Sequence, residues 1–139
     1  MSVSLIVEEG TIMEKVKIVI AEDHIRYRKT IISLLNQDHR FNVIGESSQG
    51  EEAVQLATQL RPDVVLMDIK LDGKNGIEAT REIKHVAPRI KVIALSLYTE
   101  ENQQERMFAF GASAYLDKKC SIEQIMSTIV EVNLQEQHA

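Results

Sequence analysis

Five short, mostly apolar runs recur along the chain, and each is continuous rather than alternating with polar residues. They cover residues 16–21, 41–46, 64–67, 92–95 and 114–116. Continuous apolar runs of this length are typical of strands that are covered on both faces, as in parallel sheets. The second run is the most polar of the five. We therefore predict five parallel strands, with the second at an edge of the sheet.

Between these runs, apolar residues recur every three or four positions, the spacing that places them on one face of a helix. Four such stripes consist of Tyr27, Ile31, Leu34 and Leu35; Ala53, Leu56, Ala57 and Leu60; Ile77, Thr80, Ile83 and Ala87; and Ile122, Ile125, Met126 and Ile129. Ser121 and Gln124 fit a capping box at the start of the last one. A fifth helix is predicted on a weaker pattern over residues 100–110, where Gly111 suits a C-terminal cap.

Strands and helices thus alternate along the chain, which predicts a doubly wound α/β fold with helices on both faces of a five-stranded parallel sheet. We assign this domain to residues 15–134. Residues 1–14 are expected to be a flexible or vector-derived extension, and residues 135–139 a tail. In such sheets the ligand site lies beyond the carboxyl ends of the strands.

The composition is that of an ordinary globular protein, with 44% hydrophobic and 27% charged residues. A net charge of −5 disfavours direct binding to nucleic acid. No apolar run has the length needed to cross a bilayer. The single cysteine, Cys120, excludes an internal disulfide and suggests a reducing compartment. We therefore expect a cytoplasmic protein that itself contacts neither DNA nor a membrane.

Reactive side chains stand where the predicted strands end. Glu22 and Asp23 follow the first strand, Asp68 the third and Ser96 the fourth, and Lys118 comes soon after the fifth. The carboxyl ends of parallel strands share one edge of the sheet, so these groups are expected to converge. Three carboxylates repel one another, and Lys118 supplies only part of the counter-charge. A hard divalent cation is predicted to supply the rest, Mg²⁺ or alternatively Mn²⁺.

The segment after the first strand is acidic and lacks the glycines that cradle a bare phosphate. This favours phosphoryl chemistry on a carboxylate, with Asp68 as the nucleophile. An EF-hand calcium loop is excluded because Lys70 and Ala79 stand where oxygen ligands are needed. The histidines and Cys120 lack the spacing of a zinc site. Residues 26–29 are interpreted as a solvated face of the first helix.

Four motifs in order carry a family resemblance: VIAEDH at 19–24, the segment 64–76, IALS at 93–96 and GASAYLDK at 111–118. Over most of its length the chain resembles a CheY-like receiver domain of a two-component response regulator. It is most similar to receivers of the LuxR/NarL-type helix-turn-helix group. The resemblance implies a flavodoxin-like (βα)5 fold with strand order 2-1-3-4-5.

The resemblance also implies a phosphoacceptor switch that regulates transcription. Asp68 would take a phosphoryl group from a histidine kinase in an Mg²⁺-dependent reaction. Asp23 would bind the Mg²⁺ directly and Glu22 through a water molecule. Asp68 and the backbone carbonyl of Lys70 would complete the protein ligands.

Three further residues receive roles in the same way. Lys118 would pair with the phosphoryl oxygens and Ser96 would donate its hydroxyl to them, so both join Asp68 as catalytic residues. Tyr115 would turn inward as Ser96 moves, which makes these two the switch residues. The implied partners are a sensor histidine kinase, a DNA-binding output domain absent from this chain, and a second copy in a phosphorylation-dependent homodimer.

Two alternatives stay open. One is an unphosphorylated docking module. The other is a metal-dependent phosphohydrolase, which Lys70 disfavours because such enzymes often need a second acid two positions beyond the nucleophile. A receiver catalyses only its own phosphorylation and dephosphorylation, so we do not expect an enzyme.

Asp72 and Lys119 replace prolines that are usual in the family, and Ser96 replaces threonine. Bulky Lys70 and Tyr98 predict slow self-dephosphorylation, lasting minutes or longer.

Overall fold

The computed structural model describes residues 5–8, 11–97 and 101–135, and its centre is a parallel sheet of five strands. The strands are β3 (Val16–Ala21), β4 (Phe41–Ser47), β5 (Val64–Asp68), β6 (Lys91–Ser96) and β7 (Ala114–Asp117). They lie in the order β4-β3-β5-β6-β7, which is 2-1-3-4-5 among the five. The predicted fold class and strand order are therefore confirmed, and β4 occupies an edge as its polar sequence predicted.

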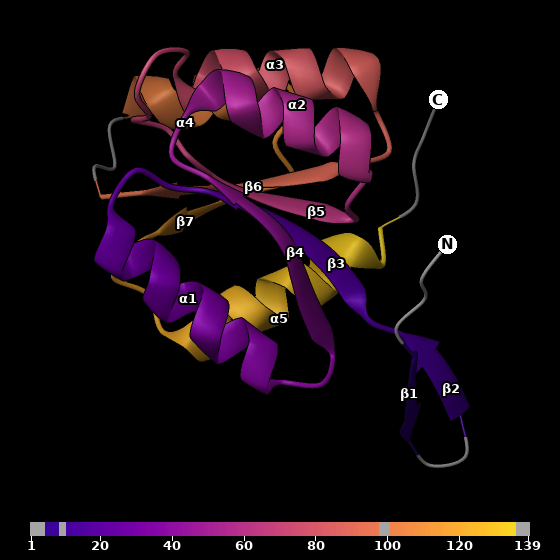
Figure 1. Ribbon diagram of the computed structural model, residues 1–139. Helices are drawn as coiled ribbons and strands as arrows, with labels where there is room; N and C mark the ends of the chain where they lie inside the picture. Colours follow the sequence, from indigo (N-terminus) through magenta and orange to yellow (C-terminus); the bar gives the residue numbers. More distant parts are fainter. Residues whose placement is uncertain (1–4, 9–10, 98–100, 136–139) are drawn as a thin grey trace.

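Helices cover both faces of the sheet (Figure 1). They are α1 (Ile25–Gln37), α2 (Gly50–Leu60), α3 (Gly76–Val86), α4 (Glu101–Ala109) and α5 (Ile122–Asn133). Helices α1 and α5 lie on one face, and α2, α3 and α4 lie on the other. The helix predicted on a weaker pattern over residues 100–110 is thus present as α4, although Glu100 of that range lies outside the described residues.

Two apolar layers attach these helices to the sheet. Val19, Val65 and Val92 pack against α2, α3 and α4. Ile18 and Leu66 point to the opposite face and pack with α1 and α5. Every residue of β5 is buried, because this central strand is covered on both faces. A strand buried in this way holds the residue at its carboxyl end in a fixed place.

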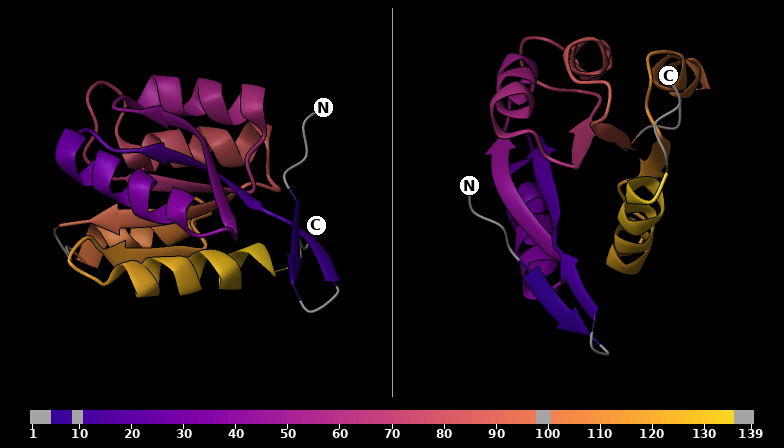
Figure 2. Two further views of the ribbon diagram at one scale, coloured as in Figure 1. Left: turned by 60° about the horizontal axis from the view of Figure 1, so that its bottom comes forward. Right: turned by 90° about the vertical axis from the view of Figure 1, so that its right-hand side faces the viewer.

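A short antiparallel ribbon precedes the domain. It pairs β1 (Leu5–Glu8) with β2 (Thr11–Glu14) and projects from the amino end of β3 (Figure 2). The sequence did not predict these two strands, because residues 1–14 were interpreted as an extension outside the domain. The division of the chain into extension, domain and tail stays a prediction.

Local packing at the start of α3 fixes the loop that follows β5. A Cβ atom on Gly76 would lie 2.1 Å from the backbone oxygen of Asp68, so only glycine fits there. At α5, the Ser121 hydroxyl accepts the N–H of Gln124 at 3.1 Å, which confirms Ser121 as the cap and supplies one of the two hydrogen bonds of a capping box. None of the described helices is both long and apolar enough to cross a membrane.

Candidate functional site

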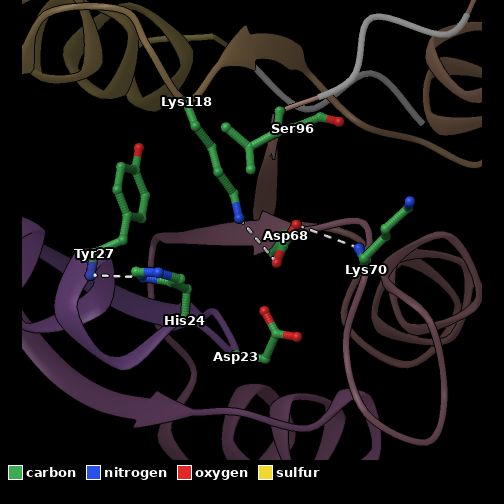
Figure 3. A pocket seen from close by; sticks show the side chains of 8 residues that line it. Asp23, His24, Tyr27, Asp68, Lys70, Ser96 and Lys118 are labelled. Carbon is green, nitrogen blue, oxygen red and sulfur yellow. Dashed lines mark hydrogen bonds and ion pairs between the residues drawn. The ribbon is translucent and has the colours of Figure 1, made fainter.

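A pocket of about 370 Å³ opens at the carboxyl ends of the strands (Figure 3). It is lined by Asp23, His24, Tyr27, Asp68, Lys70, Ser96, Leu97 and Lys118. These residues come from the carboxyl ends of β3, β5, β6 and β7, from the connections that follow them, and from the start of α1. The place agrees with the general position of ligand sites in doubly wound sheets.

Three carboxylates gather at this pocket. Glu22, Asp23 and Asp68 each place an oxygen within 4.8 Å of the others. Glu22 and Asp68 are buried, whereas Asp23 is exposed. The structure therefore brings together the three acidic residues that the sequence placed after the first and third strands.

Lys118 provides the positive charge inside this cluster. Its ammonium lies 2.6 Å from Oε1 of Glu22 and 3.0 Å from Oδ2 of Asp68. Burial by itself lowers the pKa of Lys118, but the contacts with the two carboxylates outweigh it and raise the pKa above its ordinary value. The neighbouring Lys119 is exposed.

The environment of Asp68 changes its pKa. Burial, with repulsion from Glu22, raises its pKa to about 7, although Lys118 opposes the change. Its Oδ1 accepts the backbone N–H of Lys70 at 3.2 Å. Asp68 thus faces the pocket with a charged form that a single ammonium does not fully stabilise, and in that form it can act as a nucleophile.

The donor set fits a divalent cation. Three carboxylates exceed the one ammonium by two negative charges, and carboxylate oxygens are the ligands that Mg²⁺ prefers. Both oxygens of Glu22 are already engaged, one by Lys118 and the other by the backbone N–H of His24 at 3.0 Å. Asp23, whose carboxylate is exposed at the pocket, is therefore the residue best placed to bind a cation directly. Asp68 lines the same pocket, whereas Glu22 does not.

The remaining residues named from the sequence divide into two groups. Ser96, which is buried, and Lys70 both line the pocket. Tyr115 does not line it: it lies on β7 opposite Ala94 and packs against the apolar layer under α2, α3 and α4. Tyr98 lies outside the described residues. The structure thus assembles the proposed catalytic and cation-binding residues, with Tyr115 set apart from them.

The Asp72 carboxylate lies outside the acidic cluster. Asp72 is exposed and does not belong to the group formed by Glu22, Asp23 and Asp68. Its backbone instead forms a β-bridge with Gln49 and accepts the N–H of Gly50 at 3.4 Å. The residue that replaces the usual proline therefore ties the loop after β5 to the start of α2.

Sequence reasoning overlooked residues of α1 that border the site. Residues 26–29 were interpreted as a solvated face, which is wrong for Tyr27 and Arg28. Tyr27 covers Lys118, whose ammonium lies 5.4 Å from the centre of its ring. The Arg28 side chain is only 12% exposed. His24 caps α1 by accepting the N–H of Tyr27 at 3.2 Å. A tyrosine within an apolar helix stripe carries no local signal of such a contact.

Comparison with known proteins agrees with this geometry. The sequence model of the response regulator receiver domain family matches residues 18–130. The transcriptional regulatory protein DegU of Brevibacillus brevis is 35% identical over 115 residues, which are 83% of this chain and 49% of DegU. The response regulator GacA of Pseudomonas aeruginosa is 34% identical over 117 residues, 84% of this chain and 55% of GacA. The chain spans about half the length of the curated relatives it matches.

Solved structures show the same similarity. A DNA-binding response regulator of the LuxR family from Staphylococcus aureus is 31% identical with a TM-score of 0.79, and the match covers 85% of this chain and 98% of that one. The receiver domain of the response regulator NarL from Mycobacterium tuberculosis has a TM-score of 0.84 at 24% identity, with coverage of 88% and 98%. The latter similarity is one of fold.

Proposed function

Because the chain belongs to the response regulator receiver domain family, we propose that it is a phosphoacceptor switch in which Asp68 is the residue phosphorylated. The observation that carries this proposal is the position of Asp68. It is buried at the end of the central strand, open to a pocket, and 3.0 Å from the ammonium of Lys118. No other described carboxylate combines these features.

The reaction transfers a phosphoryl group to a carboxylate oxygen of Asp68. A new O–P bond forms while the P–N bond of a phosphohistidine breaks, and the leaving imidazole keeps the bonding electrons and takes a proton from solvent. A small donor such as acetyl phosphate reacts in the same way through its P–O bond. Lys118 is placed to neutralise charge that develops on the phosphoryl oxygens.

Mg²⁺, when bound by Asp23 and Asp68, neutralises negative charge on the phosphoryl group and so lowers the barrier to its transfer. Glu22 contacts Lys118 and, as the family pattern implies, would bind the ion through a water molecule. We also assign the backbone carbonyl of Lys70 to the ligand set, as the family pattern implies. Mn²⁺ has the same ligand preference and is expected to substitute.

The consequences of phosphorylation are assigned to Ser96 and Tyr115. Ser96, at the end of β6, is proposed to bind the phosphoryl group, and Tyr115 to change its packing as Ser96 moves. A change of this kind alters the surface offered to a partner. The kinase, a DNA-binding output domain, a homodimer and a cytoplasmic location are proposals drawn from membership of the receiver family. Lys70 and Tyr98 are proposed to slow hydrolysis of the acyl phosphate.

The test is intact-mass measurement after incubation with acetyl phosphate, with Mg²⁺ and with a chelator. We expect the wild type to gain one phosphoryl group only when Mg²⁺ is present, and Asp68→Asn to gain none. Asp72→Asn is the matched control, because it removes an exposed carboxylate from the same loop outside the acidic cluster. An adduct on Asp68→Asn equal to that on the wild type would disprove the assignment.

A further inference from the structure

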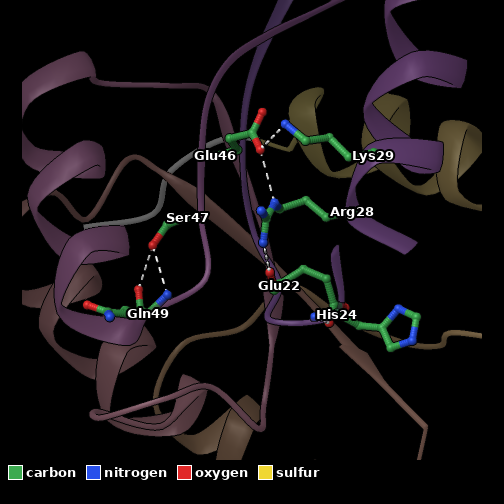
Figure 4. Close-up of polar contacts among 7 residues, drawn as sticks. All are labelled: Glu22, His24, Arg28, Lys29, Glu46, Ser47 and Gln49. Atoms are coloured by element: carbon green, nitrogen blue, oxygen red, sulfur yellow. Dashed lines mark hydrogen bonds and ion pairs between the residues drawn. The ribbon is translucent and has the colours of Figure 1, made fainter. Parts of the chain in front are cut away.

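The backbone of Glu22 is held on both sides, and Figure 4 shows its contact with Arg28. Its N–H donates to the carbonyl of Ser47 at 2.9 Å, at the end of β4. Its own carbonyl accepts a hydrogen bond from Nη1 of Arg28 at 2.6 Å. Because each peptide unit is planar, these two bonds fix the peptide planes before and after the Glu22 Cα atom. The second of these planes leads directly into Asp23.

Asp23 depends on this backbone more than Glu22 does. The Glu22 carboxylate is bound by Lys118 and by the N–H of His24. The Asp23 carboxylate is exposed and has no ion pair or hydrogen bond with any residue that the structure describes. The direction in which Asp23 points is therefore set by the peptide that precedes it.

Arg28 holds that peptide by a two-sided contact. Its Nε lies 3.0 Å from Oε1 of Glu46 at the end of β4, while its Nη1 binds the carbonyl of Glu22. A planar guanidinium can make both contacts at fixed geometry, which a lysine ammonium cannot do. The next residue, Lys29, reaches the same Glu46 oxygen at 2.8 Å but remains 59% exposed. In Figure 4 the Lys29 side chain points to Glu46, whereas the Glu22 carbonyl is contacted by Arg28.

We propose that Arg28 is a positioning residue for the cation site, which orients Asp23 by fixing the Glu22 carbonyl between α1 and β4. Among the described residues, Arg28 forms no ion pair or hydrogen bond with the carboxylates of Glu22, Asp23 or Asp68, and it does not line the pocket, so it would act through the peptide between Glu22 and Asp23. The inference rests on the proposed function, because it takes the acidic cluster to be the cation site.

The experiment is a Mn²⁺ titration of the full chain, with free Mn²⁺ measured by electron paramagnetic resonance. Arg28→Lys keeps the positive charge but removes the planar guanidinium that makes both contacts. The dissociation constant for Mn²⁺ is expected to rise about tenfold, the usual scale for residues that orient a metal ligand. Lys29→Ala is the matched control, since it removes a cation from the same Glu46 oxygen. A change of less than about twofold is expected for this exposed pair.

A second readout separates positioning from general damage. The rate of phosphorylation by acetyl phosphate is measured against Mg²⁺ concentration for the same proteins. Arg28→Lys is expected to need about tenfold more Mg²⁺ for half of its maximal rate, with the maximal rate changed by less than about threefold. If Arg28→Lys fails to fold by far-UV circular dichroism, Arg28→Met, which keeps most of the stem, takes its place.

Asp23→Asn in the same titration tests the proposed cation site separately from the role of Arg28. Binding by the wild type that is lost in Asp23→Asn would support the cation site. Wild-type affinity in Arg28→Lys would then overturn the role of Arg28 and leave the proposed function standing. Equal losses in Arg28→Lys and Lys29→Ala would also overturn it, because they would indicate a general disturbance of α1. An absence of binding in the wild type would overturn the proposed cation site itself.

Discussion

Replacing the phosphoacceptor is expected to stabilise the metal-free domain. Burial and the neighbouring Glu22 raise the pKa of Asp68 from 3.8 to about 7. At about 1.4 kcal/mol per pH unit, this shift corresponds to at most about 4 kcal/mol between the neutral and charged forms. An asparagine side chain at this position would resemble the neutral form in shape and would leave Lys118 paired with Glu22. The Asp68→Asn variant is therefore expected to have the larger free energy of unfolding.

The sign follows from proton binding. The folded state holds the Asp68 proton more tightly than the unfolded chain does, so stability from this group is complete below the unfolded pKa of 3.8 and is lost as the pH rises to about 7. Because the pocket is open to solvent, the effect on the free energy of unfolding is smaller than the full pKa shift would give. We expect the advantage of Asp68→Asn to be about 1–2 kcal/mol larger at about pH 8.5 than at about pH 5.

Urea unfolding in the presence of a chelator measures this difference at both pH values. Glu105→Gln is the control, because it makes the same chemical change at an exposed position of α4. Groups that titrate alike in both proteins cancel in the comparison. An advantage that stays constant within about 0.3 kcal/mol across this pH range, or that reverses, would refute the electrostatic account of the site.

Three further substitutions test contacts in and around the pocket, each by urea unfolding of the metal-free protein. Lys118→Met should lower the free energy of unfolding by about 3 kcal/mol, because it leaves the buried carboxylates of Glu22 and Asp68 without their ammonium. A smaller loss at about pH 8.5 than at about pH 5 would contradict this explanation. Tyr27→Phe should stabilise the fold by about 1 kcal/mol, because the tyrosine hydroxyl is buried without a hydrogen-bond partner in the described part of the chain; a destabilised variant would indicate a partner. Gly76→Ala should cost about 2–3 kcal/mol by forcing α3 away from β5, and an unchanged midpoint would show that the loop yields freely.

The sequence by itself determined the order and type of the elements in the domain. Continuous apolar runs and helical stripes are local patterns, and their alternation admits essentially one architecture. The same reasoning placed Glu22, Asp23, Asp68 and Ser96 at one edge of the sheet, because strand ends in a parallel sheet share an edge. The cap at Ser121 was also predictable, since a cap depends on residues within one turn.

Only the tertiary structure decided which of these groups touch. Lys118 bridges Glu22 and Asp68, and Arg28 joins the Glu22 carbonyl to Glu46 on another strand. Such contacts depend on the side-chain rotamers and on the close packing of segments far apart in the chain, and they leave no periodic pattern in the sequence. Arg28 shows the difference: in the sequence it belongs to a run of polar residues, and in the folded protein it is nearly buried against the loop that carries the acidic residues.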